Sequence, residues 1–408
     1  MLDIEAPNVD SSRMRRAGKE LLSLALIDAR NHSLRWIAAF EQALQATAMT
    51  VPPSADLNPP LWELGHVGWF QEYWIARNVQ RQRGERCDPS GPRLASILPE
   101  ADRCYDAAQQ PHASRWQLKL PDLQSTKQYL VDTLETTLEL LVATPDDDDD
   151  TLYFYRLALF HEDMHVESLA TMSQTLGFDA GLLPPPATLA PREPLLFPAT
   201  RWTLGSDASG FVFDNERAAH EITLPEFEID AQAVSWAQFC EFVEDGGYDQ
   251  RAHWSEAGWA WVQREGRRTP RHVDQMRQGV LQRRFGKLVR VPMAQPVVHL
   301  SWFEADAWCR WAGRRLPSEV EWEAAAHQGA SRGFRWGEVW EWTASSFRAY
   351  PGFMAGPVRD FSASSFGTNK VLRGACPATR GRMRSATFRN FHLPERDDIF
   401  AGFRSCSF

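Results

Sequence analysis

The sequence lacks the features that define several large classes of protein. None of its apolar runs approaches the roughly 18 residues that a membrane-spanning helix needs. The N-terminal segment MLDIEAPNVDSSRMRR contains no apolar core of a secretory signal. The six cysteines lie far apart without a Cys-x-x-Cys pair, which argues against a disulfide framework. We therefore expect a cytoplasmic protein that has no membrane partner.

A basic surface is also lacking, whereas tryptophan is abundant. The formal net charge is −9, so nucleic acid is not an expected partner, because its binding requires a face rich in Lys and Arg. The 17 tryptophans concentrate in the second half of the chain and suggest a loop-rich domain with buried indoles. A length of 408 residues predicts two or three domains.

The first part of the chain, residues 1–180, is predicted to form a four-helix bundle. Apolar residues recur at helical spacing in four segments: 14–47, 61–80, 125–143 and 152–177. One long connection, about residues 81–124, separates the second segment from the third. Bundles of this kind commonly build metal sites between facing helices.

Beyond residue 180 the texture of the sequence changes. Residues 181–198, GLLPPPATLAPREPLLFP, are too rich in proline for regular structure and are interpreted as an interdomain linker. Residues 199–408 alternate turns with short strand-like runs (EITLPEFEID, QPVVHLSW, NKVLRGAC) and one helical segment, LPSEVEWEAAA. The expected fold class is therefore multidomain, an α bundle followed by an α+β domain whose functional side chains lie on loops.

The fourth helical segment contains the string His-Glu-x-x-His, from His161 to His165. On a helix, this string is typical of zinc hydrolases, in which Glu162 would be the general base. The two imidazoles, about 5–6 Å apart at Cβ, can reach one ion. Glu167 lies about 200° around the helix from His165 and does not share their face. The continuation VESLATMSQTLG offers no third zinc ligand in the known spacing, although a more distant glutamate stays open.

His66, at the middle of the second helical segment, is the best third ligand for the same ion. A lone histidine on an aromatic helix is more often a core or surface residue. A bundle, however, places helix centres opposite each other, and the pair His161 and His165 supplies a metal nearby. Three imidazoles leave about half of an octahedron open, which suits Fe(II) with O2 and a substrate. We therefore predict an Fe(II) site at His66, His161 and His165.

Segments along nearly the whole chain, in order, resemble one family, the ergothioneine-biosynthesis sulfoxide synthases. The segments are GHVGWF (65–70), HEDMHVE (161–167), FVFDNE (211–216), EDGGYDQRAHWSEAGWAWV (244–262), VWEWTAS (339–345), YPGF (350–353), KVLRGAC (370–376) and RNFHLPERDDIFAGFR (389–404). The resemblance implies a DinB-like bundle followed by a C-type-lectin-like domain of the formylglycine-generating-enzyme (sulfatase-modifying-factor) type. It also implies that His66, His161 and His165 bind iron, and that the enzyme uses O2 to join a chalcogen to the imidazole C2 of hercynine (histidine betaine).

The same resemblance assigns residues to the betaine site. Asn390, Phe391 and Tyr350 occupy positions that line this site in the family, and aromatic faces bind quaternary ammonium groups. Tyr350 is the one candidate for a catalytic side chain.

On the side of the chalcogen donor, the sequence departs from the enzymes that use cysteine derivatives. Met164 replaces a glutamine, Phe347 replaces a tyrosine that donates a proton or electron, and His392 replaces an aspartate that holds the donor's amine. The arginine-rich stretch that binds the donor's carboxylates has no clear counterpart in residues 81–106. The related selenoneine synthases take selenium from a neutral selenosugar, which needs no such clamp. We favour carbon–selenium bond formation, with Met164, Phe347 and His392 binding substrate, and keep a sulfoxide synthase using cysteine or γ-glutamylcysteine as the alternative.

Three further functions stay open at this point. A zinc hydrolase would use His161, Glu162 and His165. A non-catalytic lectin-like binding module would not need three histidines together. Formylglycine-type activity would need reactive thiols, for which Cys376 and Cys406 are candidates, but free cysteines are often core residues.

Overall fold

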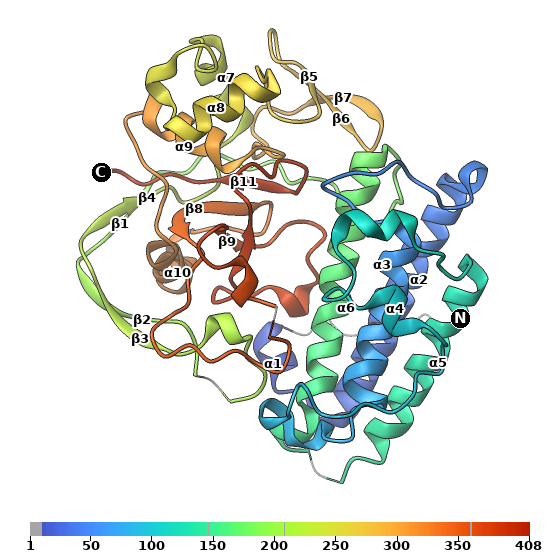
Figure 1. Cartoon of the computed structure of the whole chain (residues 1–408). Helices are drawn as coiled ribbons and strands as arrows, with labels where there is room; N and C mark the ends of the chain where they lie inside the picture. Colours follow the sequence, from blue (N-terminus) through green and yellow to red (C-terminus); the bar gives the residue numbers. More distant parts are fainter. Residues whose placement is uncertain (1–9, 146, 208, 360) are drawn as a thin grey trace.

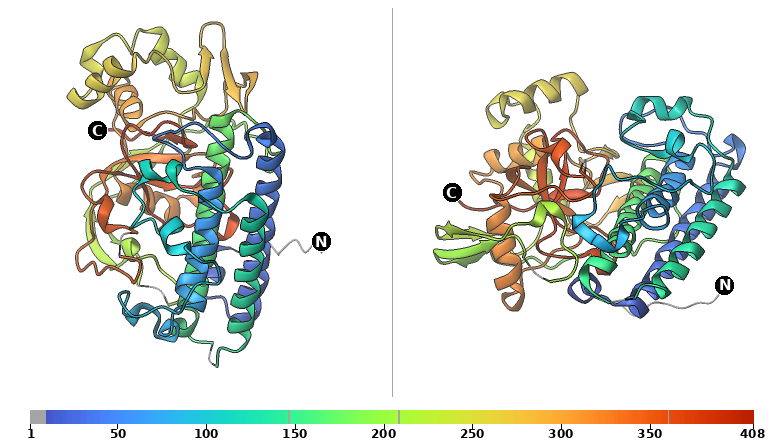
Figure 2. Two further views of the ribbon diagram at one scale, coloured as in Figure 1. Left: turned by 45° about the vertical axis from the view of Figure 1, so that its right-hand side comes forward. Right: turned by 60° about the horizontal axis from the view of Figure 1, so that its bottom comes forward.

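The computed structural model describes residues 10–145, 147–207, 209–359 and 361–408 and shows a helical part beside a part that mixes helices and strands (Figure 1). The helices of the first part are α1 (Ser11–Arg15), α2 (Lys19–Ala43), α3 (Pro60–Gln71), α4 (Ala101–Tyr105), α5 (Leu123–Val142) and α6 (Asp149–Leu176). In the bundle formed by α2, α3, α5 and α6, both α2 and α3 pack against α5 and α6. The long helices run side by side in the left view of Figure 2. The predicted bundle is confirmed.

Two of the predicted helices end differently from the periodic pattern. The first is split, because Gly18 caps α2 where the backbone meets Asp147, and a Cβ on Gly18 would come within 2.6 Å of Asp147 Oδ2. The second is shorter, because α3 passes into a π-helical turn at Glu72–Ala76 and helical structure stops before Arg77. Apolar periodicity does not report either feature, since both depend on local backbone contacts.

The connection 81–124 is more structured than the sequence indicates. It contains the 3-10 turns Arg81–Arg86 and His112–Gln117 as well as α4. It folds back onto α3, where Trp62 Nε1 donates to the carbonyl of Cys104 at 2.8 Å. It therefore covers the part of α3 that carries His66.

The C-terminal region, residues 195–408, contains four small sheets and four α-helices among its described residues. The strands are β1 (Leu195–Phe197), β2 (Thr200–Leu204), β3 (His220–Leu224), β4 (Phe227–Ile229), β5 (Val273–Gln275), β6 (Val280–Arg284), β7 (Lys287–Val291), β8 (Trp340–Ser346), β9 (Lys370–Gly374), β10 (Asn390–His392) and β11 (Ala401–Phe403). The sheets have the orders β1-β4, β2-β3, β5-β6-β7 and β10-β9-β8-β11. Within the last sheet only β11 and β8 are parallel.

Several strand predictions need correction. EITLPEFEID forms two strands, β3 and β4, because Pro225 interrupts the ladder. QPVVHLSW forms no strand beyond an isolated bridge at Pro296, since proline lacks the donor and His299 has a left-handed backbone with φ 64°. NKVLRGAC contains β9 as predicted, and β1 begins at Leu195, inside the predicted linker.

Three helices of the C-terminal region were missed. Besides α10 (Glu319–Gln328), which was predicted, the structure contains α7 (Trp236–Glu244), α8 (Glu256–Glu265) and α9 (Trp302–Trp311). Both α7 and α9 begin with a capping box, Ser235 with Gln238 and Ser301 with Glu304. The Ser-x-x-Gln/Glu spacing was therefore a usable signal in the sequence.

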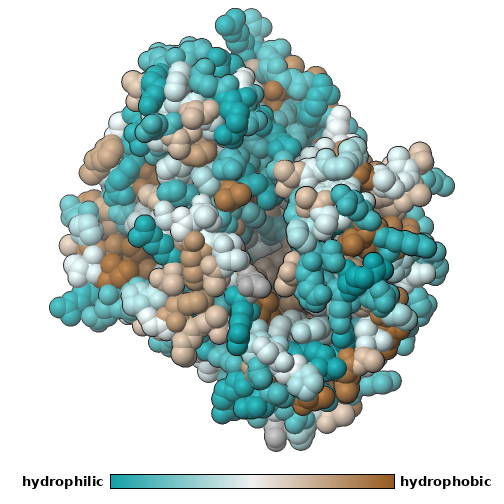
Figure 3. All heavy atoms as spheres, in the orientation of Figure 1, coloured by the Kyte–Doolittle hydropathy of each residue, from teal (hydrophilic) through white to brown (hydrophobic). Residues whose placement is uncertain are grey.

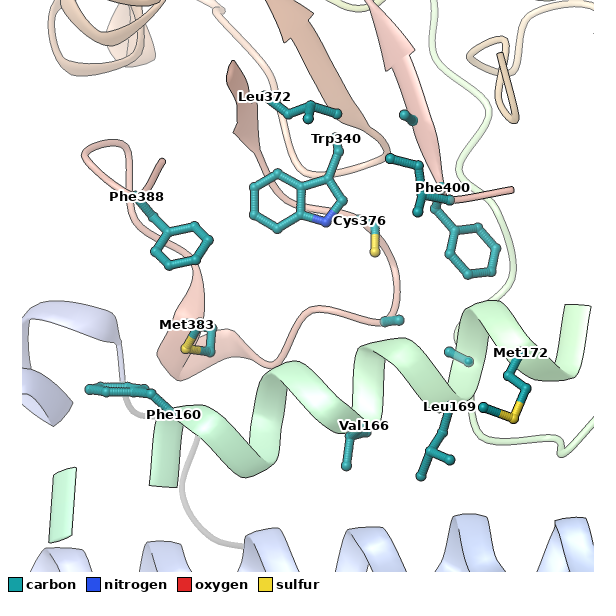
Figure 4. Close-up of a cluster of buried hydrophobic side chains, with 14 of the residues drawn as sticks. Phe160, Val166, Leu169, Met172, Trp340, Leu372, Cys376, Met383, Phe388 and Phe400 are labelled. Atoms are coloured by element: carbon teal, nitrogen blue, oxygen red, sulfur yellow. The ribbon is translucent and has the colours of Figure 1, made fainter. Parts of the chain in front are cut away.

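Helix α6 joins the bundle to the C-terminal region. In Figure 4, Phe160 lies near Met383, while Trp340 and Cys376 point toward the helix and Val166 and Leu169 point to the opposite side. Ionic contacts reinforce this packing, because the Arg382 guanidinium donates to both oxygens of Asp163 at 2.7 Å and to Asp28 at 2.6 Å. The rotation of α6 about its axis is thereby fixed.

None of the described helices combines the length and apolarity that crossing a membrane would require. All six cysteines are free and buried.

Candidate metal centre

Three histidines from two helices of the bundle converge. His66 lies on α3, and His161 and His165 lie one turn apart on α6. One ligand atom from each of the three lies within 4.8 Å of the others, and the described residues contain no other such group of His, Cys, Asp or Glu side chains. The structure thus brings together the three residues that the sequence predicted as ligands.

The protonation of His66 and His161 fits a bound cation. Burial lowers the pKa of His66 to about 3, helped by His165, and it lowers the pKa of His161 well below its ordinary value. Both imidazoles are therefore neutral near pH 7, the form that binds metals. The Nε2 atoms of His161 and His165 are 3.1 Å apart. Metal–nitrogen bonds of about 2.1 Å at right angles would place two nitrogens about 3 Å apart, so the donor set fits a divalent transition metal.

Outer contacts orient each ring differently. Nδ1 of His66 lies 2.8 Å from the carbonyl oxygen of Tyr105, and Nδ1 of His165 lies 2.7 Å from Oε1 of Glu63. His161 instead stacks on Phe70, with ring centroids 3.6 Å apart. Because Nδ1 of His66 and His165 is engaged, Nε2 of each is the nitrogen left for a metal.

Glu162 does not share this site. Its carboxylate accepts from the Arg30 guanidinium at 2.9 and 3.1 Å and from the Ser33 hydroxyl at 2.7 Å, inside the bundle. The same guanidinium donates to Gln71 of α3 at 2.6 Å and to the carbonyl of Leu130 of α5. Glu162 is therefore committed to an ion pair that ties the bundle together, and the zinc-hydrolase interpretation loses its general base.

Glu167 faces the C-terminal region, as its position on the helix predicted. Its carboxylate accepts from the indole N–H of Trp340 and from the Thr379 hydroxyl, the latter at 2.6 Å. It does not complete a ligand set with His165.

Phe391 and Asn390, predicted for the betaine site, lie on β10 beside other aromatic rings. Phe391 stacks on Phe347 with centroids 4.1 Å apart, and Phe361 approaches it at 6.2 Å. Asn390 Oδ1 accepts from the Phe391 backbone N–H at 2.9 Å. Rings continue from Phe361 through Phe213 to Phe160, the residue before His161. This aromatic series connects β10 to the helix that carries two of the histidines.

Tyr350, the predicted catalytic candidate, lies in an ionic cluster of the C-terminal region. Its hydroxyl donates to Glu319 at 3.0 Å and accepts from Arg373 at 3.2 Å, and the Arg389 guanidinium lies 3.9 Å from its ring centroid. Burial, with the charge of Glu319, raises its pKa well above the ordinary value. No ring contact or hydrogen bond among the described residues joins Tyr350 to the three histidines.

The three predicted donor-side residues are partly or fully enclosed. Phe347 is fully buried, and Met164 packs against the apolar core from a helix position between the histidine side and the C-terminal region. Burial, aided by Arg396, lowers the pKa of His392 to about 3, so this ring is neutral. Figure 3 shows that the molecular face is hollowed between the helical part and the C-terminal region.

The outer residues Glu63, Tyr105 and Phe70 were missed by the sequence analysis. Glu63 precedes His66 by three residues in WELGHV, which places both on one side of the helix, and this spacing was the available signal. Nothing in the local pattern indicated that the carbonyl of Tyr105 would reach His66.

Both parts of the chain match known protein families. Residues 35–172 match the DinB superfamily, and residues 181–338 match the sulfatase-modifying factor enzyme 1-like domain. Hercynine oxygenases from Mycolicibacterium smegmatis and Mycobacterium tuberculosis are each 32% identical over 85% of this chain and 90% of theirs. That of Mycolicibacterium thermoresistibile is 31% identical over 94% of both chains. The chain belongs to the hercynine oxygenase family.

Membership of this family confirms the resemblance and the order of the two domain types. The DinB match contains His66, His161 and His165. The sulfatase-modifying-factor match stops at residue 338, before Phe347, Tyr350 and the β10 residues Asn390, Phe391 and His392.

Proposed function

We propose that this chain is an O2-dependent Fe(II) enzyme that joins a chalcogen to the imidazole C2 of hercynine. The observation that carries the proposal is the convergence of three imidazoles, ligand atoms within 4.8 Å of one another, in a chain whose curated relatives are hercynine oxygenases. Iron would supply the redox chemistry that activates O2, which Zn2+ cannot do. The chain's own residues hold the metal, bind the betaine and shape the donor pocket.

The metal would be held by one ring nitrogen each of His66, His161 and His165. The absence of a carboxylate from this ligand set leaves the site's net charge to the metal and its exchangeable ligands. Glu162 is paired with Arg30, so it cannot serve as a base for hydrolysis. A redox function therefore fits these residues better than a hydrolytic one.

Hercynine would be bound by Phe391 with Asn390. A trimethylammonium group is attracted to aromatic faces, and the half-buried ring of Phe391, with Phe347 stacked behind it, offers such a face. Asn390 presents an amide that can bind the carboxylate or imidazole of the betaine. Equal affinity for histidine and hercynine would contradict this assignment, because a primary ammonium is costlier to desolvate.

For the donor we propose a selenosugar. Phe347 carries no hydroxyl, Met164 no charge, and His392 is neutral, so none of the three balances the charges of a cysteine derivative. A buried ligand charge without a partner costs several kcal/mol, whereas a neutral sugar avoids that cost. A second candidate is sulfoxide synthesis from cysteine or γ-glutamylcysteine, favoured by the 31–32% identity to hercynine oxygenases along the chain. We place the reaction in the cytoplasm, where the six free cysteines stay reduced.

The test is an aerobic competition between donors. The Fe(II)-loaded protein is incubated with hercynine and equal amounts of selenosugar, thiosugar, cysteine and γ-glutamylcysteine, and the products are identified by mass spectrometry. We expect the selenosugar product to exceed the cysteine products by several decades, since each buried unpaired charge is worth several kcal/mol. Efficient sulfoxide formation from γ-glutamylcysteine, with none from the selenosugar, would replace the selenium assignment with the second candidate.

A further inference from the structure

Glu63 connects one of the three histidines to the surface of the bundle. Its side chain is 1% exposed, and its Oε1 lies 2.7 Å from Nδ1 of His165. Oε2 accepts from Nδ2 of Asn58 at 2.6 Å. The Asn58 Oδ1 accepts in turn from Arg115 Nη1 at 2.7 Å. An uninterrupted chain of polar groups thus runs from Arg115 to His165.

The surroundings of the hydrogen bond between Glu63 and His165 are largely apolar. A small apolar cavity lined by Leu64, Val67, Val166 and Leu169, among others, adjoins Glu63 and His165. Such a low-dielectric surround strengthens a charged hydrogen bond.

The same surface arginine also contacts the support of His66. The Arg115 guanidinium lies 3.7 Å from the ring centroid of Trp62, and Trp62 stacks on His66 with centroids 4.8 Å apart. Arg115 and Tyr105, whose carbonyl meets Nδ1 of His66, both belong to the connection 81–124. One segment of chain therefore supports two histidines, which lie on different helices.

We propose that Glu63 is a positioning residue that fixes the proton of His165 on Nδ1, and that Asn58 and Arg115 hold its carboxylate in place. The Nε2 lone pair of His165 is then directed toward Nε2 of His161, where a metal would bind. The inference rests on the proposed three-histidine site and extends it to residues that touch no substrate. Carboxylates that accept from the second nitrogen of a ligating imidazole raise its basicity, and their loss typically weakens metal binding about 10–100-fold.

The test uses metal affinity and the tautomer of His165, both measured without turnover. Co(II) and Fe(II) are titrated anaerobically into metal-free wild-type protein and into Glu63→Gln, Glu63→Ala and Arg115→Gln. We expect Glu63→Gln to weaken binding of both metals about 10–100-fold, Glu63→Ala to weaken it at least as much, and Arg115→Gln to weaken it less. In metal-free protein, 15N spectra of the imidazoles should show the Nδ1–H form for His165 and lose that preference in Glu63→Ala.

Glu72 provides a matched control on the same stretch of helix. It is also buried, at 2% exposure, but its carboxylate accepts from Ser96 and Tyr129, each at 2.6 Å. Glu72→Gln should leave Co(II) affinity and the His165 tautomer unchanged, whatever it does to stability. If the loss of any buried glutamate weakened metal binding, Glu72→Gln would also bind Co(II) less tightly than wild type.

The outcomes separate this inference from the function on which it rests. Wild-type Co(II) affinity and an unchanged His165 tautomer in the Glu63 variants would overturn the inference and leave the metal site standing. Failure of wild-type protein to bind Co(II) or Fe(II) would instead refute the proposed function. Where the Glu63 variants do not fold, Asn58→Ala takes their place, and an unchanged affinity and tautomer in that variant would also overturn the role of Glu63.

Discussion

Two buried polar clusters of this chain differ in how their charges are arranged. In the C-terminal region, Glu319 accepts from Arg389 at 2.8 and 3.0 Å and from Arg373 at 3.1 Å, so opposite charges face each other. In the bundle, the rings of His66, His161 and His165 face one another, and the Nε2 atoms of the α6 pair are 3.1 Å apart. Opposite charges in contact compensate one another, whereas converging ring nitrogens can be satisfied together by one cation. The comparison separates a structural cluster from a ligand site.

The largest expected effect comes from removing a ligand of the bundle cluster. His161→Ala should abolish iron binding and turnover, because two imidazoles alone do not retain Fe(II) against competing water. Iron content and product formation measure the two effects. Thermal unfolding of the metal-free variant should change little beyond the cost of a small cavity, which is about 1–2 kcal/mol. Full iron occupancy and rate in a variant lacking His66 would remove that residue from the ligand set.

The second effect concerns the cluster of Glu319, Arg373 and Arg389 in the C-terminal region. Glu319→Gln should lower the free energy of unfolding by about 3–5 kcal/mol, because it leaves Arg373 and Arg389 buried without their shared counter-charge. Denaturant unfolding measures this loss, and the iron affinity of the folded protein should stay at the wild-type level. Loss of iron affinity without loss of stability would place Glu319 in the metal site and contradict the distinction between the two clusters.

The contribution of Glu319 should also appear in the pH dependence of the stability of the wild-type protein. Burial alone would raise the pKa of Glu319, but Arg389 and Arg373 outweigh it and lower the folded-state pKa below the ordinary 4.5. The contribution of Glu319 to stability is therefore complete above pH 4.5 and is lost as the pH falls through its folded-state pKa. Below pH 4.5, the melting temperature of Glu319→Gln should fall less steeply with pH than that of wild type.

A smaller effect is expected from the aromatic pair on β10. Phe391→Ala should weaken hercynine binding by about 0.5–2 kcal/mol, the range of a cation–π contact, and should affect histidine less. Calorimetric titration of both ligands into the metal-loaded protein gives the ratio. A variant that loses both affinities equally would indicate a general role in packing.

The smallest effect distinguishes two roles for Tyr350. Tyr350→Phe should cost about 1 kcal/mol of stability, since it removes the hydroxyl that donates to Glu319 and accepts from Arg373, and should leave turnover near the wild-type rate. A rate that fell by orders of magnitude would instead support the catalytic role that the sequence suggested for Tyr350.

The bundle and the convergence of the three histidines were predictable, because helical periodicity and the geometry of a bundle determine both. Spacing places His161 and His165 on one helix face, and only the facing helix had to be chosen to find His66. The surroundings of Tyr350 and Phe347 were not predictable in this way, because they depend on Glu319, Arg389 and Phe391, which the fold brings together from α10 and the C-terminal strands. Contacts of that kind follow no spacing rule.

The connection 81–124 shows the same limit near the metal site. Its residues Tyr105 and Arg115 support His66 and, through Asn58 and Glu63, His165. No apolar period marks this segment, so its position beside the ligands could not be predicted from the sequence. The residues that hydrogen-bond to metal-binding side chains are brought there by tertiary packing, so the structure is needed to identify them.

The most direct test of the metal-dependent function follows the hydrogen at C2 of hercynine. Hercynine carrying deuterium at the imidazole C2 is incubated in air with Fe(II)-loaded protein and each chalcogen donor, and the isotope is read by mass spectrometry. The account predicts that deuterium is lost from the product as the carbon–chalcogen bond forms, and that His161→Ala and the metal-free protein retain it. Retention of deuterium in the wild-type reaction with every donor would contradict the account.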